Sequence, residues 1–383
     1  MKIIIIGTAY PMRGGMAHFN ELMYKYLSKD NDVKIYSFKR QYPEFLFPGK
    51  TQYEEGKALT DIPKERNIIS IDSINPFNWI KWGFKIAKEN ADLIIIKYWI
   101  PFFAPAFFTL TWIIRKFSKA KVMFQGDNVI PHEKRFGDNF LTKLALSQGD
   151  FFQVLSESVA EDLKLFNKKN KPVIHSKHPV YNLFGEKIDK REAREYIKNE
   201  FGIDVVNDKV ILFFGYIRKY KGLNYLIDAM KEVTGKMNVK LLVVGEFYED
   251  EIKYREQIKN NNLEKNIFVI SDFMPNEKVR YFFSACDLVV LPYNSATQSG
   301  ITQIAYFYDK PVVATKVGGL SEVILNEKTG YLVEPKNSGQ IAESLLKFYN
   351  ENKEGKFSDN ITEEKKKYMW ESFVKEITEG VRA

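Results

Sequence analysis

The sequence predicts an α/β protein made of two doubly wound domains with parallel sheets. The chain has 383 residues, which is too long for one ordinary core and favours two domains. Most of its apolar runs are continuous, as in strands covered on both faces, and helix-like segments alternate with them. A composition of 45% hydrophobic and 15% aromatic residues is sufficient for two cores and excludes global disorder.

Strand-like runs follow one another along both halves of the chain. In the first half they read KIIIIG, VKIYSF, NIISI, DLIIIK, KVMFQG, FFQVLS and PVIHS. In the second half they read VILFFGYI, KLLVVGE, NIFVIS, DLVVLPY, PVVATKVG and GYLVEP. The segments between them, such as LNYLIDAMKEV and NEKVRYFFSAC, repeat apolar residues at three- and four-residue spacing, which predicts helices. Each half therefore predicts one parallel sheet.

The composition changes abruptly over residues 178–208, where a charged helical stretch interrupts the apolar runs. We therefore place the domain boundary at Phe184, with a first domain over 1–184 and a second over 185–365. The last segment, about 366–383, predicts a helix with an apolar stripe of Met369, Trp370, Phe373, Val374 and Ile377. Two domains of this kind create a cleft between the carboxyl ends of their sheets, where such folds bind ligands.

The net charge of +8 does not by itself indicate a nucleic-acid-binding protein. No helix-turn-helix, RNP-like or zinc-finger pattern is present, and the lysines are mixed with glutamates as on solvated helix faces. We expect no nucleic acid partner, whereas anionic lipids or anionic substrates stay open. The single cysteine, Cys286, cannot form an internal disulfide, and the first apolar run is too short for a signal peptide. Both features favour a cytoplasmic protein.

One apolar segment, residues 98–114, resembles a membrane span in composition. It has 17 residues without a charge but contains Pro101 and Pro105. Length and proline content favour a strand end, a turn and a buried helix that begins near Pro105. An exposed aromatic face that docks on a bilayer is an alternative that this segment leaves open.

Two glycines follow the first strand and precede a helix. Gly14 and Gly15 would let a ligand approach the backbone closely, with helix amides pointing at it. The pattern is not G-x-G-x-x-G, and the second strand ends in Lys39 and Arg40 instead of an acidic residue, which disfavours a nicotinamide dinucleotide. A plain strand-to-helix turn is the alternative.

A basic loop follows the strand VILFFGYI. Gly215 makes the turn, and Arg218, Lys219 and Lys221 are close together in the loop before the next helix. Such a cluster suits a diphosphate, because an arginine binds bidentately and a lysine acts as a point charge. The alternative is a solvated basic loop.

A glycine turn follows the strand DLVVLPY. Residues 295–308 contain no Asp or Glu, and Ser299, Gly300, Ile301 and Thr302 would begin a helix. Backbone amides and the helix dipole at such a start bind phosphate. Arg218 and Lys221 on a neighbouring loop would supply the cations, so that the two loops predict one anion site.

With these motifs, the whole chain resembles the retaining GT-B glycosyltransferases, the large group 1 family that includes sucrose synthase. The segments that carry the resemblance are RGG, FFGYIRKYKG, SGITQIAYF, KPVVATKVGGLSEVI and EKTGYLVEP. The resemblance implies two Rossmann-like domains that bind acceptor and donor. It also implies that the closing helix with Trp370 crosses back to the first domain.

The sequence departs from the family's hallmark, which is a glutamate, seven residues and a second glutamate. The first glutamate would fall at Thr297 and the second at Ala305 or Ile304, none of which is acidic. Gln298 and Gln303 are the nearest residues that could hydrogen-bond a sugar.

Two further positions differ from the family pattern. The family's arginine after the turn glycine is replaced by Tyr216, so that Arg218 would take its role. In place of the family's histidine near the fifth strand stand Asp127 and Asn128, with His132 slightly later. The four histidines show no metal spacing.

The resemblance implies a retaining, metal-independent hexosyltransferase that needs no cofactor. Its substrates would be a nucleoside-diphosphate sugar and a hydroxyl of a glycan or lipid-linked acceptor, in cell-envelope polysaccharide or glycolipid synthesis. A protein of this type could contact the anionic inner face of the plasma membrane. A nucleotide-sugar epimerase and a non-catalytic GT-B binding protein are the alternatives, although the latter would have no use for a diphosphate pocket.

The implied site residues fall into three groups. The expected catalytic residues are Arg218, Lys221, Asp127 and His132. The expected acceptor-binding residues are Gly14, Gly15 and Asn128. The expected donor-binding residues are Gly215, Gly245, Asp272, Phe273, Met274, Gln298, Ser299, Gly300, Ile301, Thr302 and Gln303.

Overall fold

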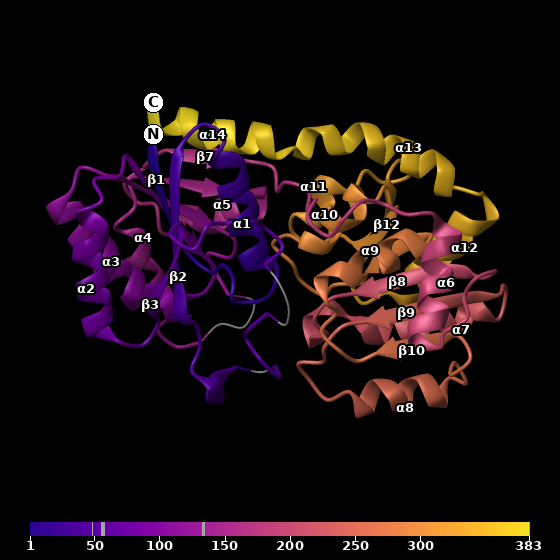
Figure 1. Cartoon of the computed structure of the whole chain (residues 1–383). Helices are drawn as coiled ribbons and strands as arrows, with labels where there is room; N and C mark the ends of the chain where they lie inside the picture. The colour runs from indigo at the N-terminus through magenta and orange to yellow at the C-terminus, as the bar shows by residue number, and fades with distance from the viewer. Residues whose placement is uncertain (48, 55–57, 132–134, 383) are drawn as a thin grey trace. The chain divides into compact units, whose positions relative to one another are not determined.

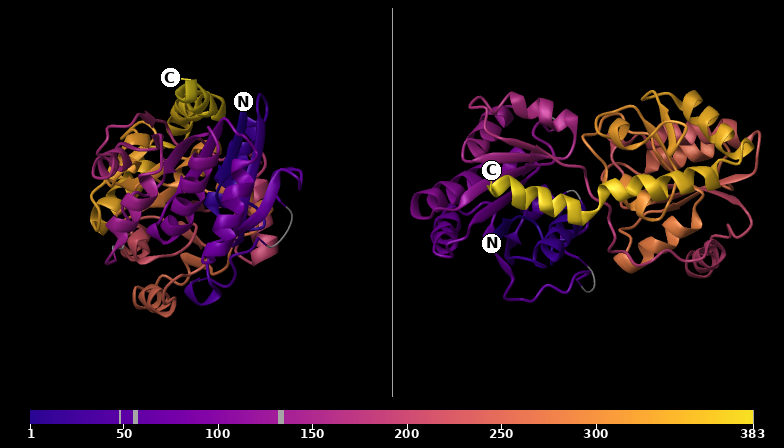
Figure 2. Two further views of the ribbon diagram at one scale, coloured as in Figure 1. Left: turned by 90° about the vertical axis from the view of Figure 1, so that its left-hand side faces the viewer. Right: turned by 90° about the horizontal axis from the view of Figure 1, so that it is seen from above.

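The computed structural model describes residues 1–47, 49–54, 58–131 and 135–382 (Figure 1). The chain forms two compact units, one of Met1–Pro179 with Tyr368–Ala383 and one of Val180–Lys367. Each unit contains one parallel sheet enclosed by helices (Figure 2). The expected α/β fold with two parallel sheets is confirmed.

The first unit contains a seven-stranded sheet of order β3-β2-β1-β4-β5-β6-β7. Its strands are β1 (Lys2–Ile6), β2 (Asp32–Arg40), β3 (Asn67–Asp72), β4 (Leu93–Tyr98), β5 (Lys121–Gly126), β6 (Phe151–Val154) and β7 (Val173–His175). They coincide with the seven apolar runs of the first half, because continuous apolar runs suit strands that helices cover on both faces. The strand order reverses between β1 and β4.

Helices cover both faces of this first sheet. One face packs against α2 (Pro76–Ala87), α3 (Ala104–Phe117), α4 (Asp138–Leu146) and α5 (Glu157–Lys164). On the other face α1 (Gly15–Leu27) packs against α14 (Trp370–Arg382), where Trp370 stacks on Tyr26 with ring centroids 5.6 Å apart. The predicted closing helix therefore exists and its stripe is covered within the first unit, except that Met369 precedes the helix and is 39% exposed.

The apolar segment over residues 98–114 folds as a strand end, a turn and a helix. β4 ends at Tyr98, a short 3-10 turn, η2 (Pro101–Phe103), follows, and α3 begins at Ala104. Among the residues that the structure describes, no helix is long and apolar enough to cross a membrane. The interpretation of this segment as a turn and a helix is confirmed.

The second unit contains a six-stranded parallel sheet of order β10-β9-β8-β11-β12-β13. Its strands are β8 (Lys209–Phe214), β9 (Val239–Val244), β10 (Ile267–Ile270), β11 (Leu288–Leu291), β12 (Val312–Thr315) and β13 (Gly330–Val333). The helices are α6 (Lys190–Phe201), α7 (Leu223–Thr234), α8 (Ile252–Asn260), α9 (Asn276–Ala285), α10 (Gly300–Phe307), α11 (Leu320–Val323), α12 (Ser338–Asn350) and α13 (Glu354–Glu364). All six apolar runs of the second half form strands.

Candidate functional site

The order of the second sheet reverses between β8 and β11, and the two predicted anion-binding loops follow these two strands. β8 and β11 pair directly, with Leu288 opposite Ile211. Ligands of open α/β sheets bind at such a reversal, outside the carboxyl ends of the strands. The topology therefore brings together two loops that lie far apart in the sequence.

Two glycines hold the loops of this edge in backbone contact. Gly222 has φ of 66°, and a Cβ there would lie 2.0 Å from the carbonyl oxygen of Pro292, which follows β11. A Cβ at Gly245 would lie 2.2 Å from the carbonyl oxygen of Gly215, which follows β8. Any larger residue at either position would push the loops apart.

Lys221 lies between these two loop contacts, next to Gly222 in the chain and close to Gly215 in space. Its side chain is buried, and among the described residues it forms no hydrogen bond or ion pair; its ammonium lies 5.7 Å from the ring centroid of Tyr293. A Cβ at Gly215 would lie 3.2 Å from Lys221 Nζ and 3.3 Å from Ile301 Cδ1, so that these three residues meet. Burial and, to a smaller extent, the charge of Arg218 lower the pKa of Lys221 to about 7.

Helix α10 begins beside Lys221, at the glycine turn. Ser299 is its N-cap and makes no side-chain capping bond; its hydroxyl lies 3.4 Å from that of Tyr293. The amide of Thr302 donates to the Ser299 carbonyl, whereas in the described part of the chain no backbone acceptor is found for the amides of Gly300 and Ile301. The predicted phosphate-binding amides are therefore those of Gly300 and Ile301.

Arg218 is exposed, and its guanidinium lies over an aromatic cluster. The distance from Arg218 Cζ to the ring centroid of Tyr248 is 4.8 Å. The ring of Tyr216 lies 4.6 Å from that of Tyr248 and stacks at 6.1 Å on that of Phe273. The three rings follow β8, β9 and β10. Sequence reasoning named Phe273 but missed both tyrosines, although Tyr216 stands where the family has arginine.

The other predicted donor residues of this region differ in exposure. Asp272 is exposed and Met274 is buried.

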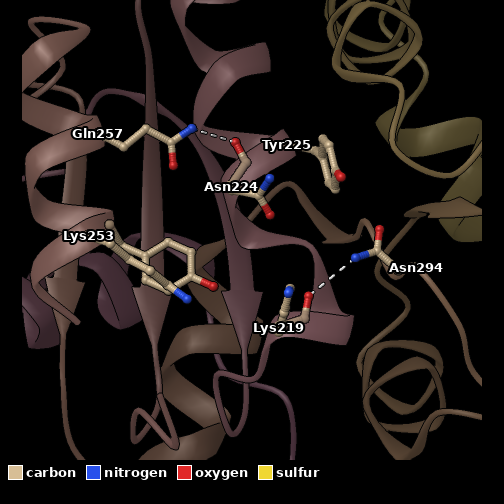
Figure 3. A pocket seen from close by; sticks show the side chains of 7 residues that line it. Lys219, Asn224, Tyr225, Lys253, Gln257 and Asn294 are labelled. Carbon is tan, nitrogen blue, oxygen red and sulfur yellow. Dashed lines mark hydrogen bonds between the residues drawn. The ribbon is translucent and has the colours of Figure 1, made fainter. Parts of the chain in front are cut away.

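Lys219 lies apart from Lys221, although both were grouped as one cationic cluster. Lys219 borders a cavity of about 310 Å³ between α7, α8 and the loop after β11 (Figure 3). The other lining residues are Asn224, Tyr225, Lys253, Tyr254, Gln257 and Asn294. Neither Arg218 nor Lys221 lines this cavity.

The two candidate positions for the second glutamate of the family hallmark are buried and apolar. Ile304 and Ala305 are buried, so that neither offers a polar group to a ligand. The hydroxyl of Thr302 and the amide oxygen of Gln303 are buried without a partner among the described residues, whereas Gln298 is half-buried. Sequence reasoning missed a buried carboxylate, Glu246, which directly follows Gly245 at the end of β9.

In the first unit, Asp127 follows β5 and is tied to a buried lysine. Asp127 Oδ1 lies 2.7 Å from Nζ of Lys97, a side chain with no exposed surface. Lys97 also donates to Gln125 Oε1 at 2.8 Å and lies 3.5 Å from the ring centroid of Phe19. Burial lowers the pKa of Lys97, and the charge of Asp127 opposes that effect. Lys97 ends the apolar run DLIIIK, which had been interpreted only as a core strand.

The Lys97–Asp127 pair is part of a buried polar row that crosses β4, β5 and β6 and ends at Ser176, directly after β7. Gln125 donates to Gln153 Oε1 at 2.6 Å, and Gln153 donates to Ser176 Oγ at 2.7 Å. Lys97, Gln125 and Gln153 are register partners, so their side chains share the α1 face of the sheet. Burial, together with the charge of Lys97, lowers the pKa of the nearby His178 to about 3, which keeps this imidazole neutral.

The remaining predicted residues of the first unit are Gly14, Gly15, Asn128 and His132. Gly14 has φ of 98° and forms the N-cap of α1, which begins at Gly15. Asn128 is half-buried beside Asp127. His132 lies outside the described residues. In the described part of the chain, no group of three His, Cys, Asp or Glu side chains is placed to hold a metal ion.

The family is decided by comparison with known proteins. Residues 195–368 match the family model described as glycosyl transferases group 1. An uncharacterized glycosyltransferase of Methanocaldococcus jannaschii is 25% identical over 381 residues, which cover 98% of this chain and 96% of the relative. Over residues 195–368 the chain is therefore a group 1 glycosyltransferase.

Two further relatives of this glycosyltransferase have named functions. The N-acetyl-alpha-D-glucosaminyl L-malate synthase of Bacillus anthracis is 23% identical over 286 residues, which cover 75% of this chain and 72% of the relative. The capsular polysaccharide biosynthesis glycosyltransferase CapM of Staphylococcus aureus is 29% identical over 191 residues, 45% of this chain and 48% of the relative.

Solved structures share the fold of this glycosyltransferase. HepE of Anabaena, solved in complex with UDP, superposes with a TM-score of 0.72 at 17% identity over 100% of both chains. The expected GT-B fold is thereby confirmed.

Proposed function

We propose that this glycosyltransferase transfers a hexose from a nucleoside-diphosphate sugar to a hydroxyl of a glycan or lipid-linked acceptor, with retention and without a metal ion or cofactor. The observation that carries the proposal is Lys221, a buried lysine beside the start of α10 that has no counter-charge among the residues that the structure describes. The complexes of HepE with UDP and with UDP-glucose support a donor of this class. Relatives such as CapM support a role in envelope polysaccharide synthesis.

The diphosphate would bind where Gly215, Lys221 and Ile301 meet. A buried ammonium is costly without an anion, and a diphosphate would supply that anion. The amides of Gly300 and Ile301 would donate to the same phosphate oxygens, aided by the helix dipole. Arg218 is exposed and would contact the outer phosphate oxygens bidentately.

The base would stack beside the aromatic cluster of Tyr216, Tyr248 and Phe273. These rings follow three neighbouring strands on the β9–β10 side of the diphosphate site. Stacking on an aromatic ring suits any nucleobase, because every base has a π-face. The cluster therefore supports a nucleotide donor but does not select the base.

In the reaction, the bond between the anomeric carbon and the diphosphate oxygen would break while the acceptor oxygen bonds to the same face of that carbon. The leaving diphosphate would accept the proton of the acceptor hydroxyl. Lys221 and the α10 amides would stabilise the charge that develops on the diphosphate. Asp127, held in place by Lys97, would accept a hydrogen bond from the acceptor with Asn128, Gly14 and Gly15 nearby.

Nucleotide binding is expected to weaken as the pH rises above 7. The free protein then loses the proton of Lys221, whose pKa is about 7, so that binding must include proton uptake. The terminal phosphate is already ionised, because its second pKa is about 6. The dissociation constant should therefore rise by about tenfold per pH unit above pH 7, until the pKa of Lys221 in the complex is passed. Calorimetric titrations from pH 7 upward, with whichever nucleoside diphosphate binds, measure this dissociation constant, and a constant value would contradict the assignment of Lys221.

The direct test of the proposed function is the melting temperature of the purified protein with UDP, GDP, ADP and CDP, and then with their sugars. A ligand that binds only the folded state raises the melting temperature by mass action. One nucleotide should raise it, and Arg218→Ala should reduce that shift. No shift with any nucleotide would refute a nucleotide-sugar donor. With the donor known, the anomeric configuration of the product and activity in a chelator test retention and metal independence.

A further inference from the structure

Two neighbouring helices of the first unit present large apolar side chains to solvent. On α2, Phe77 is 84%, Ile80 is 43% and Phe84 is 40% exposed. On α3, Trp112 is 49% and Phe117 is 54% exposed. We call these five side chains the α2–α3 face. They are not needed to fill the core, because other residues of the same helices, including Trp79, Ile86, Leu110 and Ile114, already do so.

The apolar surfaces of the two helices are joined at one edge. Phe77, Ile80 and Phe84 follow one another at three- and four-residue spacing, which places them on one side of α2. α2 and α3 lie side by side (Figure 1). They approach closely at Gly83 of α2, where an added Cβ would lie 3.0 Å from the side chain of Ile113 on α3. At one end of the contact, the rings of Phe84 and Phe117 are 5.0 Å apart. The aromatic surface therefore extends across both helices.

Lysines surround this surface, and neither helix contains an aspartate or glutamate. Lys81, Lys85, Lys88 and Lys116 are exposed, and none of them forms an ion pair among the described residues. Two of them lie over tryptophan rings, Lys85 over Trp82 at 4.4 Å and Lys116 over Trp112 at 5.2 Å.

The carboxylate of Glu89, close to the end of α2, is bound by Lys2 and Lys34. Arg115 of α3 pairs with Asp150. The charge of the two helices is therefore positive, and in the described part of the chain their four exposed lysines have no ion-pair partner.

We propose that the α2–α3 face docks on an anionic lipid surface. Aromatic side chains are favoured at the level of lipid headgroups, and unpaired lysines beside them attract anionic lipids. The charge disfavours a second copy of the chain, since a symmetric contact would bring these lysines against their own copies. The proposal does not depend on the sugar donor, because these helices contain none of the residues assigned to substrate binding.

The test is co-sedimentation of the full chain with vesicles of phosphatidylcholine alone and of phosphatidylcholine mixed with an equal part of phosphatidylglycerol. Binding is expected only to the mixed vesicles and should weaken with added salt. The double variant Phe77→Ser, Trp112→Ser should lower the partition coefficient by about tenfold or more, because it removes apolar surface from the contact. The double variant Lys81→Gln, Lys85→Gln should lower it by about fivefold per lysine.

A matched control is Ile252→Ser on α8, which removes a single apolar side chain that is 64% exposed. It should bind vesicles like the wild type. All variants should melt at the wild-type temperature, since the replaced side chains are exposed. No binding to mixed vesicles, equal binding to both kinds, or wild-type binding by the Phe77→Ser, Trp112→Ser variant would overturn the proposal. A wild-type dimer in sedimentation that this variant converts to a monomer would also overturn it, in favour of an interface between copies.

Discussion

Replacing Asp127 by asparagine is expected to lower the free energy of unfolding of the first unit by about 3–5 kcal/mol. The carboxylate is the counter-charge of Lys97, a lysine with no exposed surface, at a distance of 2.7 Å. In the described residues, no other carboxylate pairs with Lys97, whose remaining contacts are Gln125 and the ring of Phe19. The variant either keeps an uncompensated buried cation or forces it to release its proton, and both are costly.

Urea unfolding, with amide exchange of β4 and β5 to report on the first unit, measures this loss. The control is the double variant Lys97→Met, Asp127→Asn, which removes both charges and should recover most of the stability. If the single variant loses less than about 1 kcal/mol, or the double variant is no better, the pair does not have this role. The activity of the double variant shows whether a loss of activity in Asp127→Asn comes from lower stability or from the missing carboxylate.

Replacing Lys221 by methionine is expected to have opposite effects on stability and on function. The empty folded protein should gain about 2–4 kcal/mol at pH 7, because the variant removes a buried cation whose pKa has been lowered from 10.5 to about 7. Nucleotide affinity and kcat/KM should fall by about a hundredfold or more, since a charged donor to the diphosphate is lost.

The effect of Lys221 on the free energy of unfolding should change with pH. The folded-state pKa of Lys221 lies below the unfolded-state value, so the unfolded chain binds more protons between about pH 7 and pH 10. The free energy of unfolding of the wild type should therefore rise over this range relative to that of Lys221→Met. A variant that is less stable than the wild type at pH 7 would contradict the buried, unpaired state of this lysine.

Lys219→Met is the matched control for this experiment. Lys219 is on the same loop, but it is exposed and borders the separate cavity beside α8. Its replacement should change the free energy of unfolding by less than about 0.5 kcal/mol and leave nucleotide affinity nearly unchanged. An equal loss of affinity in both variants would indicate a general effect of positive charge on the loop, not a site formed at Lys221.

Much of the fold could be predicted because its signals are local. In the described residues, each of the thirteen strands corresponds to one predicted apolar run, because burial of a strand is recorded in the residues of the strand itself. Pro101 and Pro105 stopped the apolar segment over 98–114 from being one long helix for the same local reason. Loop chemistry was also readable, because Gly215, Lys221 and Gly300 belong to short turns at strand ends.

What the sequence alone determined is therefore the order of strands and helices, the two parallel sheets and the loops that carry the candidate site. Only the tertiary structure decided which side chains meet. Strand register sets Lys97 beside Gln125 and brings it to Asp127. The folding of the loops places Lys221 and Ile301 beside Gly215, whereas Lys219 borders a separate cavity. The reason is that periodicity reports whether a residue is buried, whereas the identity of its partner depends on strands and loops that are distant in the chain.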